Sequence, residues 1–321
     1  MNEHPYGHPF QLNAWGELKA TTGWQSHLLG YYDQQQLVAG AHMLTLPLPG
    51  VRKKIAYIPR GPVIDPEHPQ RDNVLSDLVA FAASLGAFYL KIEPQWRHAA
   101  LPDGWQHSRE TILHQETVAT SLTADDEESL LASISKNSRY LARRALREGV
   151  ELVDVTDANT IDAVYEVYKE TARRAGFELH PLDYYQTCFR LLGDSNLVLL
   201  AYRESRPVAF LWGVYTKQTG IYLYGGSNDE GRDSLANYAL QMELIQRLYR
   251  LGVVWYDLNG LVTSGVTSFK EKFAHEHITW IGSYDYPINA GLYQTWYSFG
   301  TRLRPVVRSL KRLLYRSGLG A

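Results

Sequence analysis

A phenylalanine and a lysine stand side by side in a short turn near the C-terminal end of the chain, at Phe269 and Lys270. A lysine ammonium can bind phosphate or a developing oxyanion, and an aromatic ring can stack on an unpaired base. Phe273 follows Phe269 at a spacing that places both rings on one helical face, while Lys270 and Lys272 lie off that face. The pattern therefore indicates either a site for phosphate or an oxyanion, or a surface turn whose lysines are merely solvated.

The elements around this turn are expected to be strands at 255–258 and 278–286, joined through a loop in which Gly260 and Gly265 permit sharp turns. Upstream, the pattern predicts strands at 117–122, 150–155, 197–203, 207–215 and 220–225, and helices at 160–175, 181–192 and 234–251. On the last of these strands, Tyr222 and Tyr224 should point to one face, because side chains repeat every two residues.

The N-terminal part also mixes helices and strands. The pattern predicts a helix that carries Trp15 and Lys19, strands at 28–32 and 37–46, a helix at 71–85 and a strand at 87–92. That last strand delivers Glu93 at its end. At 59–62, two prolines and a glycine surround Arg60, which predicts a rigid, exposed bend.

Basic residues gather in the helices expected after an acidic stretch at 125–128: Lys136, Arg139, Arg143, Arg144 and Arg147. Arg139, Arg143 and Arg147 share one face by their spacing. A face of like charges costs stability, so it indicates an anionic partner unless it is simply solvated.

Composition and charge exclude several classes of protein. The chain has 321 residues and a formal net charge of −2, so any polyanion would have to be held by local patches. A single cysteine, Cys188, rules out an intramolecular disulfide and fits a reducing, cytoplasmic location. Neither a signal peptide nor a membrane-spanning apolar run is predicted. The histidines are scattered, so we expect no metal site. We also expect no cofactor.

The segment from Tyr256 to Phe273 resembles the signature of the FemABX family, non-ribosomal peptidyltransferases that add amino acids from aminoacyl-tRNA to peptidoglycan precursors. The family has a Tyr-Asp-Leu-Gly-Gly-like strand end and then Gly-Val-x-x-Phe-Lys-x-x-Phe-Gly. This chain has Tyr-Asp-Leu-Asn-Gly at 256–260 and Gly-Val-Thr-Ser-Phe-Lys-Glu-Lys-Phe at 265–273, with Ala274 replacing the last glycine. Further matches are Gln11, Trp15, Lys19, the bend at 59–62 and Glu93-Pro94.

The resemblance implies an α/β (α+β) fold of two tandem GNAT-like acyltransferase domains, without the coiled-coil helical arm of some members. The domains would comprise 1–115 plus 283–321, and 116–282. It also implies an enzyme whose partners are aminoacyl-tRNA and a lipid-linked or UDP-linked peptidoglycan precursor. Since the ester is already activated, such an enzyme mainly has to position two substrates, stabilise an oxyanion and manage one proton.

Single residues acquire roles from the resemblance. Phe269 and Lys270 match the family pair that holds the 3′ end of the tRNA, and Glu93 matches an acidic position that could accept the amine's proton or merely form an ion pair. The matches to precursor-binding positions are Lys19, His180, Tyr184 and Tyr224. Because the family has an arginine where this chain has His180, the residues expected to compensate in binding diphosphate are Arg60, Arg173 or Arg174.

The segment 292–316 is predicted to be a basic amphipathic helix, which could contact the inner membrane leaflet peripherally or dock on the first domain by its apolar side. Two other functions stay open. An acyl-CoA-dependent N-acyltransferase would need a glycine-rich pyrophosphate loop at a helix start, and the sequence at 231–234 lacks that spacing. A non-catalytic protein binding RNA or membranes would keep the basic helices and could dispense with Lys270.

Overall fold

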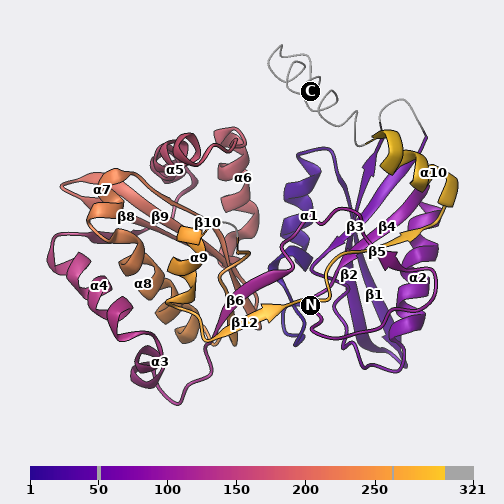
Figure 1. Ribbon diagram of the computed structural model, residues 1–321, viewed down its shortest axis with the longest axis horizontal. Coiled ribbons are helices and arrows are strands. Elements are labelled where there is room, and N and C mark those ends of the chain that lie inside the picture. Colours follow the sequence, from indigo (N-terminus) through magenta and orange to yellow (C-terminus); the bar gives the residue numbers. More distant parts are fainter. Residues whose placement is uncertain (49–51, 262–263, 301–321) are drawn as a thin grey trace, which may run out of the picture.

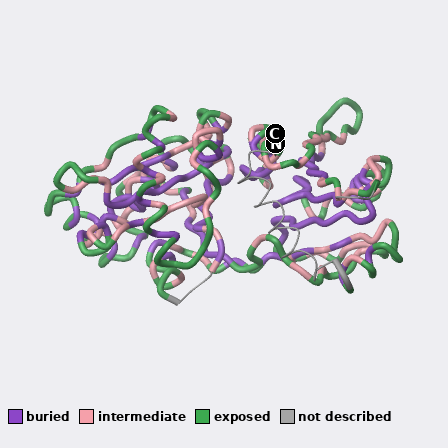
Figure 2. The backbone as a smooth tube through the Cα atoms, turned by 90° about the horizontal axis from the view of Figure 1, so that it is seen from above, coloured by how far each residue is buried: buried purple, intermediate pink, exposed green. Residues whose placement is uncertain are grey.

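The computed structural model describes residues 1–48, 52–261 and 264–300. Two α/β halves lie side by side, each built on its own sheet (Figure 1). Seen from above, buried backbone runs through the middle of both halves and exposed segments form the outside (Figure 2). This mixed α/β architecture is the predicted fold class. The longest described helices have 15 residues, so no coiled-coil arm is present among them.

The first sheet has the order β1-β2-β3-β4-β13-β5, in which only the pair β3 and β4 is parallel. Its strands are β1 (Gln25–Asp33), β2 (Gln36–Pro47), β3 (Lys54–Pro59), β4 (Ala87–Glu93), β5 (Gln106–His107) and β13 (Tyr284–Pro287). Helix α2 (Arg71–Ser84) packs on Ala41 and Met43 of β2. His42, between them, lies against Gly16 of α1 (Asn13–Ala20), so α1 covers the opposite face.

The second sheet has the order β12-β6-β11-β10-β9-β8-β7. Its strands are β6 (Glu116–Ser121), β7 (Glu151–Asp154), β8 (Asn196–Arg203), β9 (Arg206–Tyr215), β10 (Thr219–Ser227), β11 (Trp255–Asp257) and β12 (Glu276–Thr279). Leu199 and Ala201 face one layer of helices, whereas Val198 and Leu200 face the other. Both faces are therefore covered, as the apolar runs of these strands require.

The helices divide between those two faces. On the face of Leu199 lie α3 (Glu127–Ser133), α4 (Lys136–Arg147), α8 (Ala236–Arg250) and α9 (Ser264–Glu271). On the face of Val198 lie α5 (Ile161–Ala175) and α6 (Leu182–Leu192), joined by Trp15 and Leu18 of α1. The remaining short elements are η1 (Pro9–Gln11), η2 (Ala158–Thr160), η3 (Gly193–Ser195) and α7 (Asp229–Asp233). We call these surfaces the α8 face and the α6 face.

The one long strand predicted at 278–286 is wrong. It is divided into β12, in the second sheet, and β13, in the first. Gly282 adopts φ +95° between them, where the chain changes sheets. Two segments of the chain cross between the sheets, one between β5 and β6 and the other between β12 and β13. They pair with each other: the backbone N–H of Trp280 donates to Gln115 O (3.0 Å), and Gln115 Nε2 donates to Trp280 O (2.9 Å).

The described start of the C-terminal segment docks on the first half. Helix α10 (Ala290–Thr295) and the π-helical turn η4 (Trp296–Gly300) follow β13. Tyr293 and Tyr297 donate hydrogen bonds to Asp285 Oδ2 (2.8 and 3.0 Å), and Asp285 forms a buried ion pair with Lys91 (2.8 Å). The rest of the amphipathic helix predicted at 292–316, from residue 301 on, lies outside the described residues. No helix in the described part of the chain has both the length and the apolarity to cross a bilayer.

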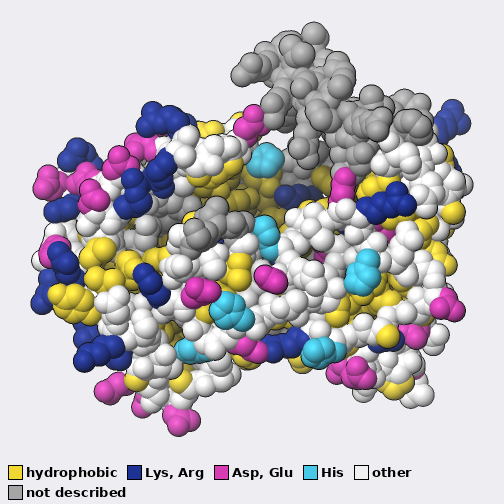
Figure 3. All heavy atoms as spheres, viewed as in Figure 1, with side chains coloured by type: hydrophobic (Ala, Val, Ile, Leu, Met, Phe, Trp, Pro, Cys, Tyr) yellow, Lys and Arg dark blue, Asp and Glu magenta, His cyan; other side chains and the backbone are white. Residues whose placement is uncertain are grey.

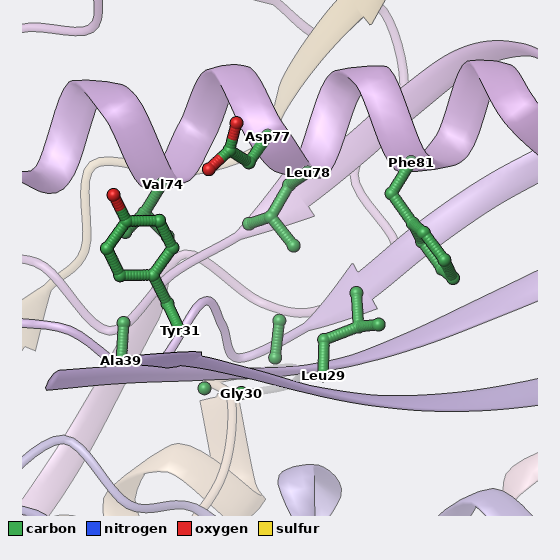
Figure 4. Close-up of a pocket in the computed structure, with 10 residues that line it drawn as sticks. Leu29, Gly30, Tyr31, Ala39, Val74, Asp77, Leu78 and Phe81 are labelled. Atoms are coloured by element: carbon green, nitrogen blue, oxygen red, sulfur yellow. The ribbon is translucent and has the colours of Figure 1, made fainter. Parts of the chain in front are cut away.

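A surface pocket of about 260 Å³ opens between α2 and the β1–β2 hairpin (Figure 4). Leu29, Leu78 and Phe81 form its apolar walls, with Asp77 on α2 and Tyr31 on β1 as its polar groups. None of the predicted site residues lines it, so it is not the candidate site.

Candidate functional site

The second sheet opens where β10 and β11 part. These parallel strands pair only from Thr219 opposite Trp255 to Ile221 opposite Asp257. Strand β11 ends there, while β10 continues alone on that side to Ser227. Beyond Ile221, β10 therefore has no neighbouring strand on that side, and the Tyr222 carbonyl accepts instead from Asn259 Nδ2 (3.2 Å).

Lys270 lies at this opening. Its ammonium donates to the carbonyl oxygens of Asn259 and Gly260, the latter at 2.7 Å, and lies 5.6 Å from the centre of the Tyr222 ring. The side chain is only 6 % exposed. Burial lowers the pKa of Lys270 to about 8, and the negative charge of Asp257 opposes that shift. Two acceptors among the described residues leave one of its three N–H bonds for a substrate.

A strained turn presents the two carbonyls to Lys270. Asn259 and Gly260 both have positive φ, at +57° and +51°. Asp257 Oδ1 accepts the Asn259 N–H (2.7 Å), which holds the turn to the end of β11. A Cβ at Gly260 would lie 2.2 Å from Cδ2 of His114, so only glycine fits there.

The hypothesis that both lysines of the turn are merely solvated is wrong for Lys270, which is buried. Lys272 is exposed and donates to the hydroxyl of Tyr238 (3.0 Å). Phe273 is fully buried, and the half-buried Phe269 packs 5.1 Å from the Tyr238 ring. The two phenylalanines therefore anchor α9 on α8, and this anchoring directs Lys270 inward.

A second cluster joins α1 to α6. Lys19 donates to the Tyr184 hydroxyl (3.1 Å) and lies 4.5 Å from the centre of the Trp15 ring. Burial lowers the pKa of the Lys19 ammonium. His180 stacks on Tyr184 with ring centres 4.0 Å apart, and partial burial, with the charge of Lys19, lowers the pKa of His180. Tyr224 packs in the same hydrophobic cluster as Tyr184, so the four predicted precursor-binding residues come together.

The prediction that Tyr222 and Tyr224 share a face is wrong, because β10 contains a bulge between them. Tyr222 pairs with Gly213 and Tyr224 with Trp212, so two steps on β10 match one step on β9. Tyr222 consequently packs on the α8 face beside Lys270, and Tyr224 packs on the α6 face beside Tyr184. The two clusters reach the open part of the sheet from its opposite faces.

Glu93 belongs to neither cluster. Its buried carboxylate accepts from the N–H groups of Ile112 (2.7 Å) and Leu113 (3.2 Å), and from the hydroxyls of Tyr57 and Ser283. These partners include both segments that cross between the sheets. The carboxylate is therefore occupied within the chain, and no described residue forms the ion pair that was the alternative to a catalytic role.

Arg60 is also internal, and the prediction of an exposed bend is wrong. Its side chain is 4 % exposed and donates to the carbonyl of His114 (2.9 Å). Gln11 fixes the bend by donating to Pro59 O and accepting from the His42 N–H (2.7 Å). The guanidinium thus supports the segment whose histidine ring lies on Gly260, and its role in binding diphosphate beside His180 stays a prediction.

His114 is a member of the site that sequence reasoning missed. Partial burial, together with the charges of Lys270 and Arg60, lowers the pKa of its imidazole. His114 connects the first half to the turn under Lys270, because its carbonyl accepts from Arg60 and its ring lies against Gly260. Nothing local marks this histidine, because its neighbours lie far away in the sequence; only the glycine it covers, Gly260, was noticed as special.

The space-filling view shows the surface hollowed between the two halves, with hydrophobic, basic and histidine side chains in the hollow (Figure 3). Lys270, a buried ammonium with one N–H that no described residue accepts, suits the stabilisation of negative charge developing on a carbonyl oxygen. Among the described residues no three His, Cys, Asp or Glu side chains gather as a metal centre would require. The deeply buried Cys188, whose thiol pKa burial raises to about 12, is unsuited to be a nucleophile.

Two family models match this chain. The model described as "FemAB family" matches residues 1–111, and the model described as "Acetyltransferase (GNAT) domain" matches residues 132–271. A curated relative, the lipid II:glycine glycyltransferase of Staphylococcus aureus, is 23% identical over 410 residues, covering 98% of this chain and 96% of the relative. Because that alignment is longer than this chain, the relative contains segments that this chain lacks.

Solved structures agree on the fold. A crystal structure of FemX superimposes with a TM-score of 0.82 at 21% identity, covering 92% of this chain and 96% of that one. A tandem GNAT protein from the clavulanic acid biosynthesis pathway gives a TM-score of 0.51 at 11% identity, covering 87% of this chain and 95% of its own. The two tandem GNAT-like units expected from the sequence are thus found in known structures of the same architecture.

Proposed function

Because this chain belongs to the FemABX family and is an aminoacyltransferase, we propose that it moves an amino acid from aminoacyl-tRNA to the stem-peptide amine of a peptidoglycan precursor. The observation that carries the proposal is the buried Lys270 at the opening between β10 and β11, with the Lys19 cluster reaching the same opening from the other face. The glycyl transfer named for the curated relative supports this reaction class and makes glycine the first amino acid to test.

The chemistry needs no covalent enzyme intermediate. The neutral amine of the precursor attacks the ester carbonyl carbon, a C–N bond forms, and the carbonyl oxygen becomes an oxyanion. The C–O bond to the tRNA ribose then breaks, and the departing 3′ oxygen receives a proton released by the amine. Lys270 donates its free N–H to the oxyanion in this proposal, and its low-dielectric surroundings strengthen that bond.

The acceptor is assigned to the α6 face. Lys19 would meet the diphosphate, and Tyr184, Tyr224 and His180 would line the channel beside it. The Lys19 ammonium lies within hydrogen-bond distance of Tyr184, and burial disfavours its charge. An anionic ligand there would stabilise that charge in place of the lost water. Since peptidoglycan precursors become lipid-linked at the cytoplasmic membrane face, we assign the protein to the cytoplasm with peripheral contact at that face. Stacking of Phe269 on the terminal adenine stays a prediction, because its ring packs on Tyr238.

An acyl-CoA donor is disfavoured by the backbone before α8. The Gly231 N–H bonds to Asn228 Oδ1 (2.9 Å), and the Ser234 N–H bonds to Glu230 O (2.9 Å). A Cβ on Gly231 would lie 2.1 Å from Val208 O, so this glycine serves close packing. Amides that a pyrophosphate loop would offer are therefore already used within the chain.

Activity is expected to depend on pH through Lys270. With a pKa of about 8, its ammonium is present at neutral pH and is lost as the pH rises. Single-turnover transfer, corrected for spontaneous ester hydrolysis and divided by the fraction of acceptor amine that is neutral at each pH, should therefore fall above about pH 8. If the rate divided in this way stays level or rises above pH 8, the ammonium form of Lys270 is not required for transfer.

The function itself is tested by transfer of radiolabelled amino acid to lipid-linked precursor. The donors would be glycyl-tRNA, a mixed pool of charged tRNA and, separately, labelled acetyl-CoA. We expect label in the precursor from a charged tRNA only. Label from acetyl-CoA alone, or from no donor with well-folded protein and both lipid-linked and UDP-linked precursors, would refute the proposal.

A further inference from the structure

Helix α4 presents a basic face that the proposed transfer site does not use. Lys136, Arg143 and Arg147 are exposed on it, and none of them has an acidic partner among the described residues. Only Arg144 of the exposed basic residues is neutralised, by Glu148 (2.8 Å). Basic side chains gather at the edge of the second half where α4 lies (Figures 1 and 3).

An aromatic ring stands within this basic face. Tyr140 is 53 % exposed, one turn after Lys136 and about one turn before Arg143 and Arg144. Beside it, Arg143 lines a groove of about 210 Å³ between α4 and α8, whose one carboxylate, Glu243, is taken by Arg247 (2.7 Å). Cations without counter-charges and an accessible ring are the groups that bind a nucleic-acid backbone.

The position of α4 connects this face to Lys270. The N-terminal turn of α4 lies against the end of α9, where Ser138 Oγ donates to Lys272 O (3.2 Å). From there to Arg147 the helix runs roughly 14 Å. Both α4 and α9 cover the α8 face, whereas the Lys19 cluster lies on the α6 face. A donor that enters over α4 would therefore reach Lys270 from the side opposite the acceptor.

We propose that the α4 face formed by Lys136, Tyr140, Arg143 and Arg147 binds the phosphate backbone of the tRNA acceptor stem while the 3′ end lies at Lys270. This assignment rests on the proposed function. A lipid surface is the weaker partner for α4, since it would place the bilayer away from the α6 face, where the lipid-linked acceptor is assigned.

The test compares two variants with the same change of charge. Arg143→Glu/Arg147→Glu alters the α4 face, and Arg52→Glu/Lys53→Glu alters exposed residues of the first half. Binding of a fluorescent RNA hairpin with an acceptor stem and an unpaired 3′ end is measured from 0.05 to 0.3 M KCl, a range chosen around roughly physiological ionic strength. We expect the α4 variant alone to bind about tenfold or more weakly, with a salt slope reduced by about 2.

Transfer assays separate this inference from the function. The α4 variant should lose kcat/KM with full-length aminoacyl-tRNA but not with the aminoacyl ester of a short oligonucleotide that lacks the stem. Arg143→Gln/Arg147→Gln should give a smaller loss in the same direction, which guards against misfolding of the reversal variant.

Two results would overturn the α4 assignment. One is hairpin binding by the α4 variant at wild-type strength. The other is loss of binding to phosphatidylglycerol vesicles with RNA binding retained, which would identify a lipid surface. If wild-type protein transfers from neither donor, the proposed function fails; if it transfers normally and the α4 variant is unaffected, only this assignment fails.

Discussion

Replacing Lys270 by methionine is expected to lower kcat for aminoacyl transfer by about 10²–10³-fold, the usual loss when one donor to an oxyanion is removed. The KM values for both substrates should change little, because the bond to the oxyanion exists only in the transition state. The fold should survive, since methionine fills a volume similar to that of lysine. Burial already disfavours the charged form of Lys270, as its lowered pKa shows, so removing the charge should cost little stability. Single-turnover kinetics and a thermal midpoint within a few degrees of wild type would together establish this.

Lys272→Met is the matched control. It makes the same substitution two residues away, where the side chain is exposed and, among the described residues, contacts the hydroxyl (3.0 Å) and the ring of Tyr238. Its kcat should stay within about twofold of wild type, as surface substitutions away from a site usually leave function intact. The assignment of Lys270 fails if Lys270→Met keeps its kcat, or if its loss of activity follows a large loss of stability, because Lys270 would then only hold the Asn259–Gly260 turn.

Most helices and strands, and the turn, could be predicted from the sequence because those features are local, but the strand expected at 278–286 is divided between two sheets. Helical spacing placed Phe269 and Phe273 on one face, and their burial against α8 is what the structure contains. The burial of Lys270 was not predictable in this way. It depends on Asn259 and Gly260 adopting left-handed conformations and on His114 covering Gly260, and these contacts join segments distant in the chain.

The division of the site between two faces was unpredictable for a related reason. Strict alternation predicts one face for Tyr222 and Tyr224, and one inserted residue in β10 reverses that result. No residue type between them signals a bulge. Yet the bulge is what separates Tyr222, beside Lys270, from Tyr224, beside Tyr184. In the proposed function, this separation would let donor and acceptor approach from opposite sides.

Replacing Glu93 by glutamine is expected to destabilise the protein and leave the shape of the pH–rate profile unchanged. A glutamine offers one acceptor oxygen where the carboxylate serves four donors, so its amide group would face N–H or O–H groups left without an acceptor. We expect a loss of about 2–3 kcal/mol in the free energy of unfolding, measured by urea denaturation. Activity should fall because both crossing segments, and with them His114, lose their anchor.

Tyr57→Phe removes one of the four donors and serves as the partner in a double-mutant cycle. Burial and the adjacent Glu93 charge together raise the pKa of Tyr57, which shows how closely the two groups interact. The single change should cost about 1 kcal/mol, and in the double variant the two losses should not add. If Glu93 were instead the base, Glu93→Gln would lose about 10²–10⁴ in kcat at full stability. In that case, Glu93 would have to release one of its present hydrogen-bond donors and bind the substrate amine instead. Glu93 would then be a catalytic residue and not a positioning residue.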